Sequence, residues 1–270
     1  MRAGGAPALA RILALAGVLA CKAADAAEVR AATEAGKGRH IYLTFDDGPL
    51  SGTMEILDIA RRMQIPVSMM MIGTQVAADK EAEALFKTAM SDPFTFVGNH
   101  SFSHASGKYA KYYSDPAGVL ADVDRNQEFL KLCKKVVRLP GRNIWWVCHR
   151  LKYDVLSGVS AAKFLADNGY TLIGWDIEWE RNPKTGEPVQ SVEEMVRDIE
   201  DAFKYSFIPG HVVVLAHDDM FRRLSEDSGL LVLLQALKKK SYIFDTLDNY
   251  PAGGCGKRRR SGSAGRAGTG

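Results

Sequence analysis

Short apolar segments alternate with amphipathic segments from residue 37 to residue 250, and this alternation limits the possible folds more than any other feature. The candidate strands are IYLTF (41–45), VSMMMIG (67–73), FTFVGN (94–99), VVRLP (136–140), YTLIGW (170–175), HVVVLAH (211–217) and SYIFD (241–245). Strands that are apolar throughout and separated by helices predict a parallel sheet with helices on its faces. We therefore expect an α/β domain whose sheet, of about seven parallel strands, is either open or closed as a barrel.

Two of the intervening segments have the apolar spacing of a helix. One seam contains Val192, Met195, Val196, Ile199 and Phe203, and another contains Leu120, Val123, Leu130 and Cys133. Residues spaced by three and four positions lie on one face of a helix, so both segments are expected to pack against the sheet.

Polar side chains occur at the carboxyl ends of five candidate strands. They are Asp46 and Asp47, His100 and His104, Arg138, Asp176, and His217. In a (β/α) barrel the loops after the strands build the active site. The sequence therefore predicts that these side chains meet at one rim.

The segment NHSFSHA contains two histidines, His100 and His104, at the spacing of one helical turn. Such a pair alone more often consists of exposed histidines without a ligand than of a metal site. A carboxylate from Asp46 or Asp47 as third ligand changes this interpretation, because two histidines and one carboxylate leave a coordination position open for water. That set is typical of a catalytic site, since a divalent ion acidifies water and polarises a carbonyl group.

The second carboxylate has a separate use, because an acid that does not bind metal can act as general base. Neighbouring residues of a strand point to opposite sides, which suits two roles if Gly48 and Pro49 bend the chain; the alternative for DDG is a solvated turn. His217 is the candidate general acid, with a core histidine as the alternative. Arg138 would keep the base ionised, unless it forms only a surface ion pair.

The composition and the termini bear on location and partners. The net charge is +3, and three of the arginines lie in the tail run KRRR, so the rest of the chain does not have the excess of basic residues that is typical of nucleic-acid binding.

Residues 1–26 have the features of an export signal, with Arg2 and Arg11 before the apolar stretch ILALAGVLA. We expect export to the periplasm, cell envelope or medium, with either a membrane-anchoring lipid on Cys21 or cleavage before Ala27. Residues 251–270 form a basic, Gly- and Ser-rich tail that we expect to be disordered.

Three further cysteines follow the signal segment: Cys133, Cys148 and Cys255. In an exported protein Cys133 and Cys148 could form a disulfide. The alternative is that both are buried, unpaired thiols.

Five motifs in this order, TFDDGP, HSFSH, RLP, WDIEW and LAH, resemble the polysaccharide deacetylase family, carbohydrate esterase family 4, over residues 41–218. The resemblance implies a distorted (β/α) barrel in a single catalytic domain over residues 37–250. It also implies a metal-dependent hydrolase that removes N-acetyl groups from polysaccharides containing N-acetylglucosamine, such as chitin, peptidoglycan or poly-N-acetylglucosamine. The alternatives are an O-acetyl polysaccharide esterase and a non-catalytic carbohydrate-binding relative.

The resemblance further implies a role for each motif residue. Asp46 would be the catalytic base, Arg138 would orient it, His217 would be the acid, and Leu215 would line the pocket for the acetyl methyl group. A divalent ion, most often zinc but also cobalt, nickel or manganese, would be bound by Asp47, His100 and His104.

The chain departs from the family pattern after RLP. There the family usually has an aromatic residue and then glycine, with a backbone N–H that stabilises the oxyanion; here Gly141 and Arg142 follow Pro140. Gly141 keeps the backbone donor, so Pro140 and Gly141 remain candidates for substrate binding.

The segment GWDIEWERNP fits the family in more than one alignment. We expect Asp176 to tune His217 and Trp179 to form a pocket wall, with Glu178 and Trp175 as alternatives. The partner is expected to be the polysaccharide, bound by a monomer. Several aromatic residues either stack on sugar rings or pack in the core: Tyr109, Tyr112, Tyr113, Trp145 and Trp146.

Overall fold

The computed structural model describes residues 38–222 and 229–251. The predicted export signal (residues 1–26), Cys21, and the predicted tail beyond Pro251 lie outside the described residues. Within the two described ranges, no helix has the length and apolar character needed to cross a bilayer.

Ten strands of the described part of the chain form one sheet. They are β1 (His40–Asp46), β2 (Val67–Met71), β3 (Thr95–Asn99), β4 (Val136–Val137), β5 (Ile144–Val147), β6 (Arg150–Tyr153), β7 (Thr171–Leu172), β8 (Ile177–Glu178), β9 (His211–His217) and β10 (Ile243–Phe244). The strand order is β6-β5-β7-β4-β3-β2-β1-β9-β8, and β10 pairs with β1. Every ladder that does not involve β5 is parallel. The sheet curls into a distorted half-barrel, which confirms the expected fold class.

The seven expected strands are present, but the hairpin of β5 and β6 was not expected. The two strands pair antiparallel and are joined by a two-residue loop, in which Cys148 and His149 have φ angles of 53° and 59°. Such loops usually contain glycine or asparagine, because both central residues need a positive φ. The sequence Cys-His carries no such signal, so the turn could not be identified.

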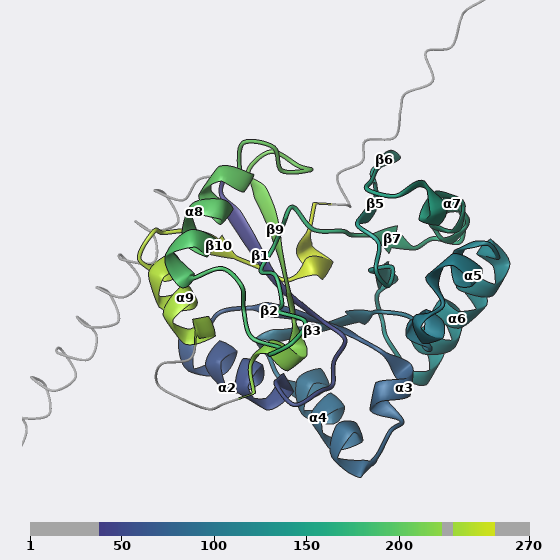
Figure 1. Ribbon diagram of the computed structural model, residues 1–270, viewed down its shortest axis with the longest axis horizontal. Coiled ribbons are helices and arrows are strands. Elements are labelled where there is room, and N and C mark those ends of the chain that lie inside the picture. The colour runs from purple at the N-terminus through teal and green to yellow at the C-terminus, as the bar shows by residue number, and fades with distance from the viewer. Residues whose placement is uncertain (1–37, 223–228, 252–270) are drawn as a thin grey trace, which may run out of the picture.

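Helices surround the sheet on both sides. The helices are α2 (Thr53–Met63), α3 (Gly73–Val76), α4 (Lys80–Ser91), α5 (Tyr109–Tyr113), α6 (Pro116–Phe129), α7 (Val159–Asp167), α8 (Val192–Ala202) and α9 (Gly229–Lys238). Short 3-10 helices are η1 (His104–Gly107), η2 (Leu156–Gly158), η3 (Asp218–Met220) and η4 (Leu247–Asn249). In Figure 1, α2, α8 and α9 lie on the left of the sheet, and α5, α6 and α7 lie on the right.

The expected helical seam on α8 is confirmed. Met195 and Ile199 are fully buried in the core that α8 shares with β1, β9 and α9. A capping box of Ser191 and Glu194 begins the helix, and such a cap typically contributes about 1 kcal/mol. The other seam ends earlier than expected: Val123 and Leu130 are buried, but Cys133 is exposed because α6 stops before it.

The expected pair of Cys133 and Cys148 does not form. Cys133 is a free and exposed cysteine, so neither the disulfide nor the alternative of a buried thiol holds for it. Cys148 is disulfide-bonded, and it lies in the loop of the β5–β6 hairpin.

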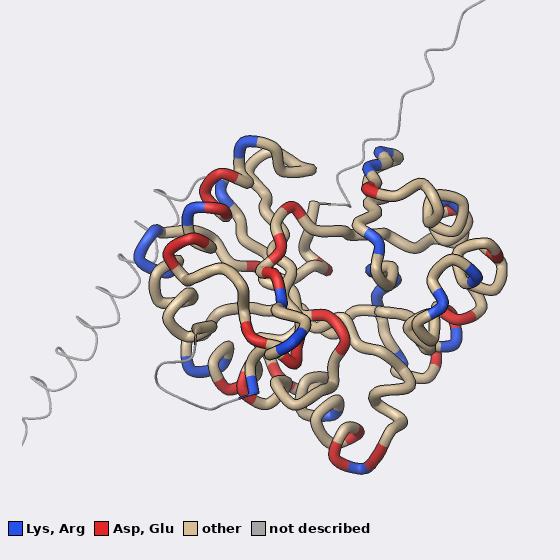
Figure 2. The backbone as a smooth tube through the Cα atoms, viewed as in Figure 1, with Lys and Arg blue, Asp and Glu red and all other residues tan. Residues whose placement is uncertain are grey.

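Acidic and basic residues are interspersed over the molecule. Figure 2 shows both kinds on each side of the fold, with acidic segments near the centre of the view. Several surface pairs of opposite charge are formed, for example between Lys163 and Asp167 at 2.6 Å. Exposed pairs of this kind contribute little to stability, roughly 0–1 kcal/mol each.

Candidate active site

The sheet brings four of the predicted residues to one rim. β1 and β9 are parallel and in register, so that Asp46 and His217, each the last residue of its strand, are direct neighbours. His100 follows β3, and Arg138 follows β4 and donates its backbone N–H to the carbonyl of Asn99. The carboxyl ends of neighbouring parallel strands share one edge, which is why residues far apart in sequence meet here.

The three predicted metal ligands converge. Asp47 Oδ1 lies 3.3 Å from His100 Nε2 and 3.1 Å from His104 Nε2, and one ligand atom from each residue lies within 4.8 Å of the others. The path of the backbone differs from the expected one. Asp47 has a φ of 74°, so it leaves the extended conformation and does not simply point away from Asp46. Ser101 and His104 also have positive φ angles, so a loop rather than a regular helical turn brings the histidines together.

The donor set fits a divalent metal ion. His100 donates its Nδ1–H to the carbonyl of Arg138 at 2.9 Å, so Nε2 is the ring nitrogen that remains to bind a metal ion. Asp47 Oδ1 is buried and receives no hydrogen bond from the described residues. Burial alone would raise the pKa of Asp47, but the imidazoles of His100 and His104 outweigh it and hold that pKa well below its ordinary value. One anionic oxygen and two imidazole nitrogens are ligands that zinc prefers.

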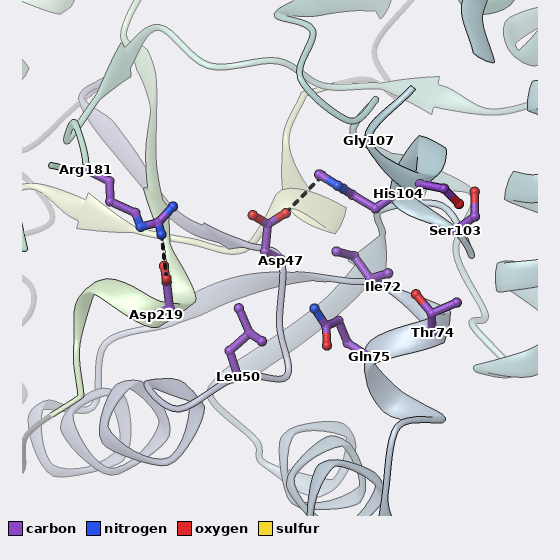
Figure 3. A pocket seen from close by; sticks show the side chains of 11 residues that line it. Asp47, Leu50, Ile72, Thr74, Gln75, Ser103, His104, Gly107, Arg181 and Asp219 are labelled. Carbon is purple, nitrogen blue, oxygen red and sulfur yellow. Dashed lines mark ion pairs between the residues drawn. The ribbon is translucent and has the colours of Figure 1, made fainter. Parts of the chain in front are cut away.

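A pocket of about 340 Å³ opens beside these ligands. Figure 3 shows the Asp47 carboxylate and the His104 imidazole facing each other, and an ion pair of Arg181 and Asp219 across the pocket. Leu50 and other side chains from the loops after β1, β2 and β3 complete the lining. Asp47 and His104 are therefore accessible to a small group from this side, whereas His100 is buried behind them.

Asp46 is held by a fully buried arginine. Arg138 Nη1 donates to Asp46 Oδ1 at 2.8 Å and to Thr44 Oγ1 at 2.7 Å. Its remaining donors reach the carbonyls of Ile173 at 3.2 Å and Gly174 at 2.8 Å. The side chain of Arg138 is 0% exposed, so the alternative of a surface ion pair is wrong. Four hydrogen bonds fix the guanidinium and with it the carboxylate of Asp46.

Thr44 was not singled out from the sequence, although it belongs to the same network. Its hydroxyl donates to the carbonyl of Val214 on β9 and accepts from Arg138. Threonine is common in strands, so its presence in an apolar strand gives no signal in the sequence. Only the folded structure shows that Thr44 links β1 to β9 and to Arg138 through hydrogen bonds.

Asp176 does not lie against His217 as expected. Its two carboxylate oxygens accept from the backbone N–H groups of Phe207 at 2.8 Å and Val213 at 3.0 Å. Burial raises the pKa of Asp176, while these two donors act in the opposite direction. The residue therefore anchors two backbone segments, and the role of tuning His217 must be assigned elsewhere.

Glu178 takes the position expected for that acid. It lies on β8 beside Leu215 of β9, two residues before His217. Burial raises the pKa of Glu178, His217 lowers it and Asp46 raises it, which places this carboxyl within electrostatic reach of both. His217 Nδ1 is buried and has no hydrogen-bond partner among the described residues.

Trp179 is a core residue rather than a pocket wall. It is 2% exposed, packs against Phe221 with ring centroids 5.6 Å apart, and donates its indole N–H to the carbonyl of Gln190. Trp175 instead is partly exposed and lies 5.9 Å from the Arg138 guanidinium. Trp175 is thus the tryptophan at the rim.

The loop after Arg138 explains the departure from the family pattern. The carbonyl of Pro140 accepts from the Tyr113 hydroxyl at 2.6 Å. Gly141 has a φ of 60°, and a Cβ at this position would lie 3.1 Å from the ring of Tyr109. Tyr109, whose ring centroid is 6.0 Å from that of His104, therefore supplies an aromatic surface where a side chain at position 141 has no room. Of the aromatic residues for which sugar stacking and core packing were both open, Trp145 and Tyr113 are buried and pack in the core.

Leu215 is buried on β9, and its side chain shares a face of the strand with that of His217, because side chains two apart point the same way. Its role as a wall for an acetyl methyl group stays a prediction.

Asp218 was also missed by the sequence reasoning. It is fully buried, and it accepts hydrogen bonds from the Gly52 N–H at 3.1 Å and from the Thr53 hydroxyl at 2.5 Å. It therefore ties the turn after His217 to the loop that carries Asp47. The sequence alone does not indicate that the acid after LAH is buried and hydrogen-bonded, since its partners Gly52 and Thr53 lie far away in the chain.

Comparisons with known proteins agree with this architecture. The sequence model of the polysaccharide deacetylase family matches residues 33–141. Chitin disaccharide deacetylase of Vibrio alginolyticus is 24% identical over 78% of this chain and 71% of its own length. Peptidoglycan-N-acetylglucosamine deacetylase of Bacillus cereus is 24% identical over 78% of this chain and 70% of its own length.

Solved structures share the fold. A carbohydrate esterase family 4 esterase from Streptococcus mutans has a TM-score of 0.59 at 22% identity, covering 81% of this chain and 89% of that one. A polysaccharide deacetylase from Bacillus cereus has a TM-score of 0.54 at 23% identity, covering 77% and 91%. Motifs, fold and relatives agree, and the chain is similar to the polysaccharide deacetylase family in sequence and in fold.

Proposed function

We propose that this protein is a metal-dependent hydrolase that removes N-acetyl groups from a polysaccharide containing N-acetylglucosamine. The observation that carries the proposal is the convergence of Asp47, His100 and His104 beside a carboxylate, Asp46, that is held by a buried arginine. Relatives named as deacetylases of chitin disaccharide and of peptidoglycan support deacetylation as the reaction.

The roles follow from the positions of the side chains. Asp46 takes the proton of the attacking water, and Arg138 holds this carboxylate in position through its hydrogen bond. Asp47, His100 and His104 would hold a divalent ion, and such an ion would supply Lewis acidity to the acetyl carbonyl and to water. The Gly141 N–H donates to the negative charge that develops on the acetyl oxygen. It makes no backbone hydrogen bond among the described residues.

Collapse of the tetrahedral state breaks the bond between the acetyl carbon and the nitrogen. His217 delivers a proton to the departing amine, and acetate is released with the oxygen that came from water. Glu178 is the positioning acid for His217 in this scheme, because it is the acid that acts electrostatically on both His217 and Asp46.

Zinc is the metal that we propose, since two imidazoles and one carboxylate with an open position form a common catalytic zinc set. Cobalt, nickel and manganese are the alternatives for the same ligands. Export is part of the proposal and is supported by the disulfide at Cys148, because disulfides persist in oxidising compartments. The mass of the mature N-terminus separates a lipidated Cys21 from cleavage before Ala27.

The test is an assay of acetate release from N-acetylglucosamine oligomers, peptidoglycan, poly-N-acetylglucosamine and acetylated xylan. We expect release from at least one N-acetylated substrate, its loss after dialysis against a chelator, and its return on addition of zinc. Release from acetylated xylan alone would favour the O-acetyl esterase. Tight sugar binding without release from any substrate would favour the non-catalytic relative.

A further inference from the structure

The two histidines of the ligand cluster are held in different ways. His100 donates from Nδ1 to the carbonyl of Arg138, and its side chain is only 3% exposed. The side chain of His104 is 26% exposed, and no residue in the described part of the chain forms a hydrogen bond with its Nδ1. Metal-binding histidines usually donate from their second ring nitrogen to a fixed acceptor, which orients the ring. The position of His104 therefore depends on the backbone that carries it.

That backbone has an unusual conformation. The φ angles of His104, Ala105 and Ser106 are 49°, 56° and 47°, and that of Ser101 is 64°. Such angles are unfavourable for residues other than glycine, and they persist where the surrounding structure holds them. The loop between the two histidines and the turn after it thus need contacts from other elements.

Asp122, on α6, anchors this loop through both its side chain and its backbone. Its Oδ2 accepts from the Ser103 N–H at 3.2 Å and from the Ser103 hydroxyl at 3.0 Å. The Tyr112 hydroxyl donates to the same oxygen at 3.0 Å. The backbone carbonyl of Asp122 accepts from the Phe102 N–H at 3.3 Å. One residue of α6 therefore holds both of the residues that immediately precede His104.

The carboxylate of Asp122 is committed to these neutral donors. Among residues 38–222 and 229–251, no Lys, Arg or His side chain forms an ion pair with it, whereas three donors reach its Oδ2. Tyr112 remains a neutral donor, because burial raises the pKa of its hydroxyl and the charge of Asp122 raises it further. Hydrogen bonds to an ionised acceptor are roughly twice as strong as those between neutral groups. Asp122 is thus a strong point of attachment for the loop.

We infer that Asp122 is a positioning residue for the metal site, because it holds the loop that places His104 opposite Asp47. The inference rests on the ligand set of the proposed function. Asp122 is not among the residues that line the pocket, and it contacts none of the three ligand side chains. It acts through the backbone of the loop, so its loss should weaken metal binding.

The experiment measures the dissociation constant of zinc by competition between the zinc-loaded protein and a chelator. Asp122→Ala should raise this constant about 10-fold, the lower end of the range for residues that orient metal ligands. Asp122→Asn keeps an oxygen that can accept from the same donors, so its constant should stay within about 3-fold of the wild type. Rescue by the amide would show that hydrogen bonding to the loop is what matters.

Asp124→Ala is the matched control. Asp124 also lies on α6 and also accepts from a tyrosine hydroxyl, that of Tyr170, at 2.6 Å. Tyr170 directly precedes β7 and is not part of the loop between the histidines. The control removes the same kind of contact from the same helix, and its zinc constant should stay within about 2-fold of the wild type, since changes without shared partners act independently.

A milder pair of variants covers the case in which Asp122→Ala does not fold. Tyr112→Phe removes one donor from Asp122, and Tyr170→Phe removes the corresponding donor from Asp124. We expect zinc to bind more weakly to Tyr112→Phe than to Tyr170→Phe, and equal constants for these two would count against the inference.

An unchanged zinc constant in a folded Asp122→Ala would overturn the inference. Equal weakening in Asp122→Ala and Asp124→Ala would also overturn it, since that result indicates a general loss of stability rather than a role in the metal site. The proposed reaction can fail separately. Weaker zinc binding in Asp122→Ala, together with no acetate release by the wild type from any substrate, would sink the reaction and leave the role of Asp122 standing.

Discussion

Asp218 should make the stability of the protein fall with rising pH. The residue follows His217, is fully buried, and accepts from the Gly52 N–H and the Thr53 hydroxyl. The Thr53 oxygen itself accepts from the Leu50 N–H at 2.9 Å, so its proton is free to be donated to Asp218. Burial is the largest effect on this carboxyl and raises its pKa from 3.8 to about 7, although the two hydrogen bonds oppose that change.

The direction and size of the effect follow from proton linkage. A carboxyl whose pKa is higher in the folded than in the unfolded chain binds its proton more tightly when folded. Its contribution to stability is therefore complete below pH 4 and is lost as the pH rises through 7. The gap between 3.8 and about 7 corresponds to about 4 kcal/mol in total. About 2.5 kcal/mol of this loss lies between pH 5 and pH 8.

Urea unfolding of the wild type and of Asp218→Asn at several pH values tests this directly. The variant has no titrating group at this position, so the difference between the two free energies of unfolding cancels all shared groups. We expect the wild type to lose about 2.5 kcal/mol relative to Asp218→Asn between pH 5 and pH 8. Thr53→Val removes a donor to the ionised form and should steepen the loss. A difference that is constant across this range, or that grows with pH, would refute the reasoning.

Three further predictions concern the surroundings of the site. Gly52→Ala should lower Tm strongly, because a Cβ there would lie 1.8 Å from the backbone oxygen of Asp218, and backbone cannot move aside cheaply; an unchanged melting curve would disprove the close packing. Arg138→Met should cost about 3–5 kcal/mol in urea unfolding, since it leaves a buried carboxylate unpaired; a cost below about 1 kcal/mol would contradict the burial of the pair. Glu178→Gln should lower kcat/KM and change the shape of its pH profile, whereas Asp176→Asn should mainly lower Tm, and the reverse pattern would restore Asp176 as the positioning acid.

The residues that meet at the rim could be predicted from the sequence, because their meeting depends only on the strands being parallel neighbours. Residues at the carboxyl ends of parallel strands share one edge, whatever the details of the loops. Asp46, His100, Arg138 and His217 meet for this reason, and the apolar character of their strands was enough to locate them.

The orientation of the ligands could not be predicted. Positive φ angles occur at three residues of the site: Asp47, Ser101 and His104. None of the three is a glycine, the residue type that would have indicated a positive φ from the sequence. Alternation along a strand would separate Asp46 from Asp47, and a helical turn would join His100 to His104. Long-range contacts override both local preferences in the folded protein.

The assignments in GWDIEWERNP failed for a different reason. β8 has only two residues, so its alternation is too short to fix which side chains face the rim. Pairing with β9 places Glu178 rather than Asp176 beside Leu215, and it buries Trp179. A register of this kind is set by the neighbouring strand rather than by the segment itself.

The central claim is that Asp46 is the base and that its neighbour Asp47 is a metal ligand. One preparation each of the wild type, Asp46→Asn and His104→Ala should be measured for zinc per chain and for acetate release. We expect Asp46→Asn to hold one zinc ion per chain, as the wild type does, and to release acetate about 10²- to 10⁴-fold more slowly. His104→Ala should lose zinc and activity together. Acetate release at the wild-type rate by Asp46→Asn, or full zinc content in His104→Ala, would contradict this assignment.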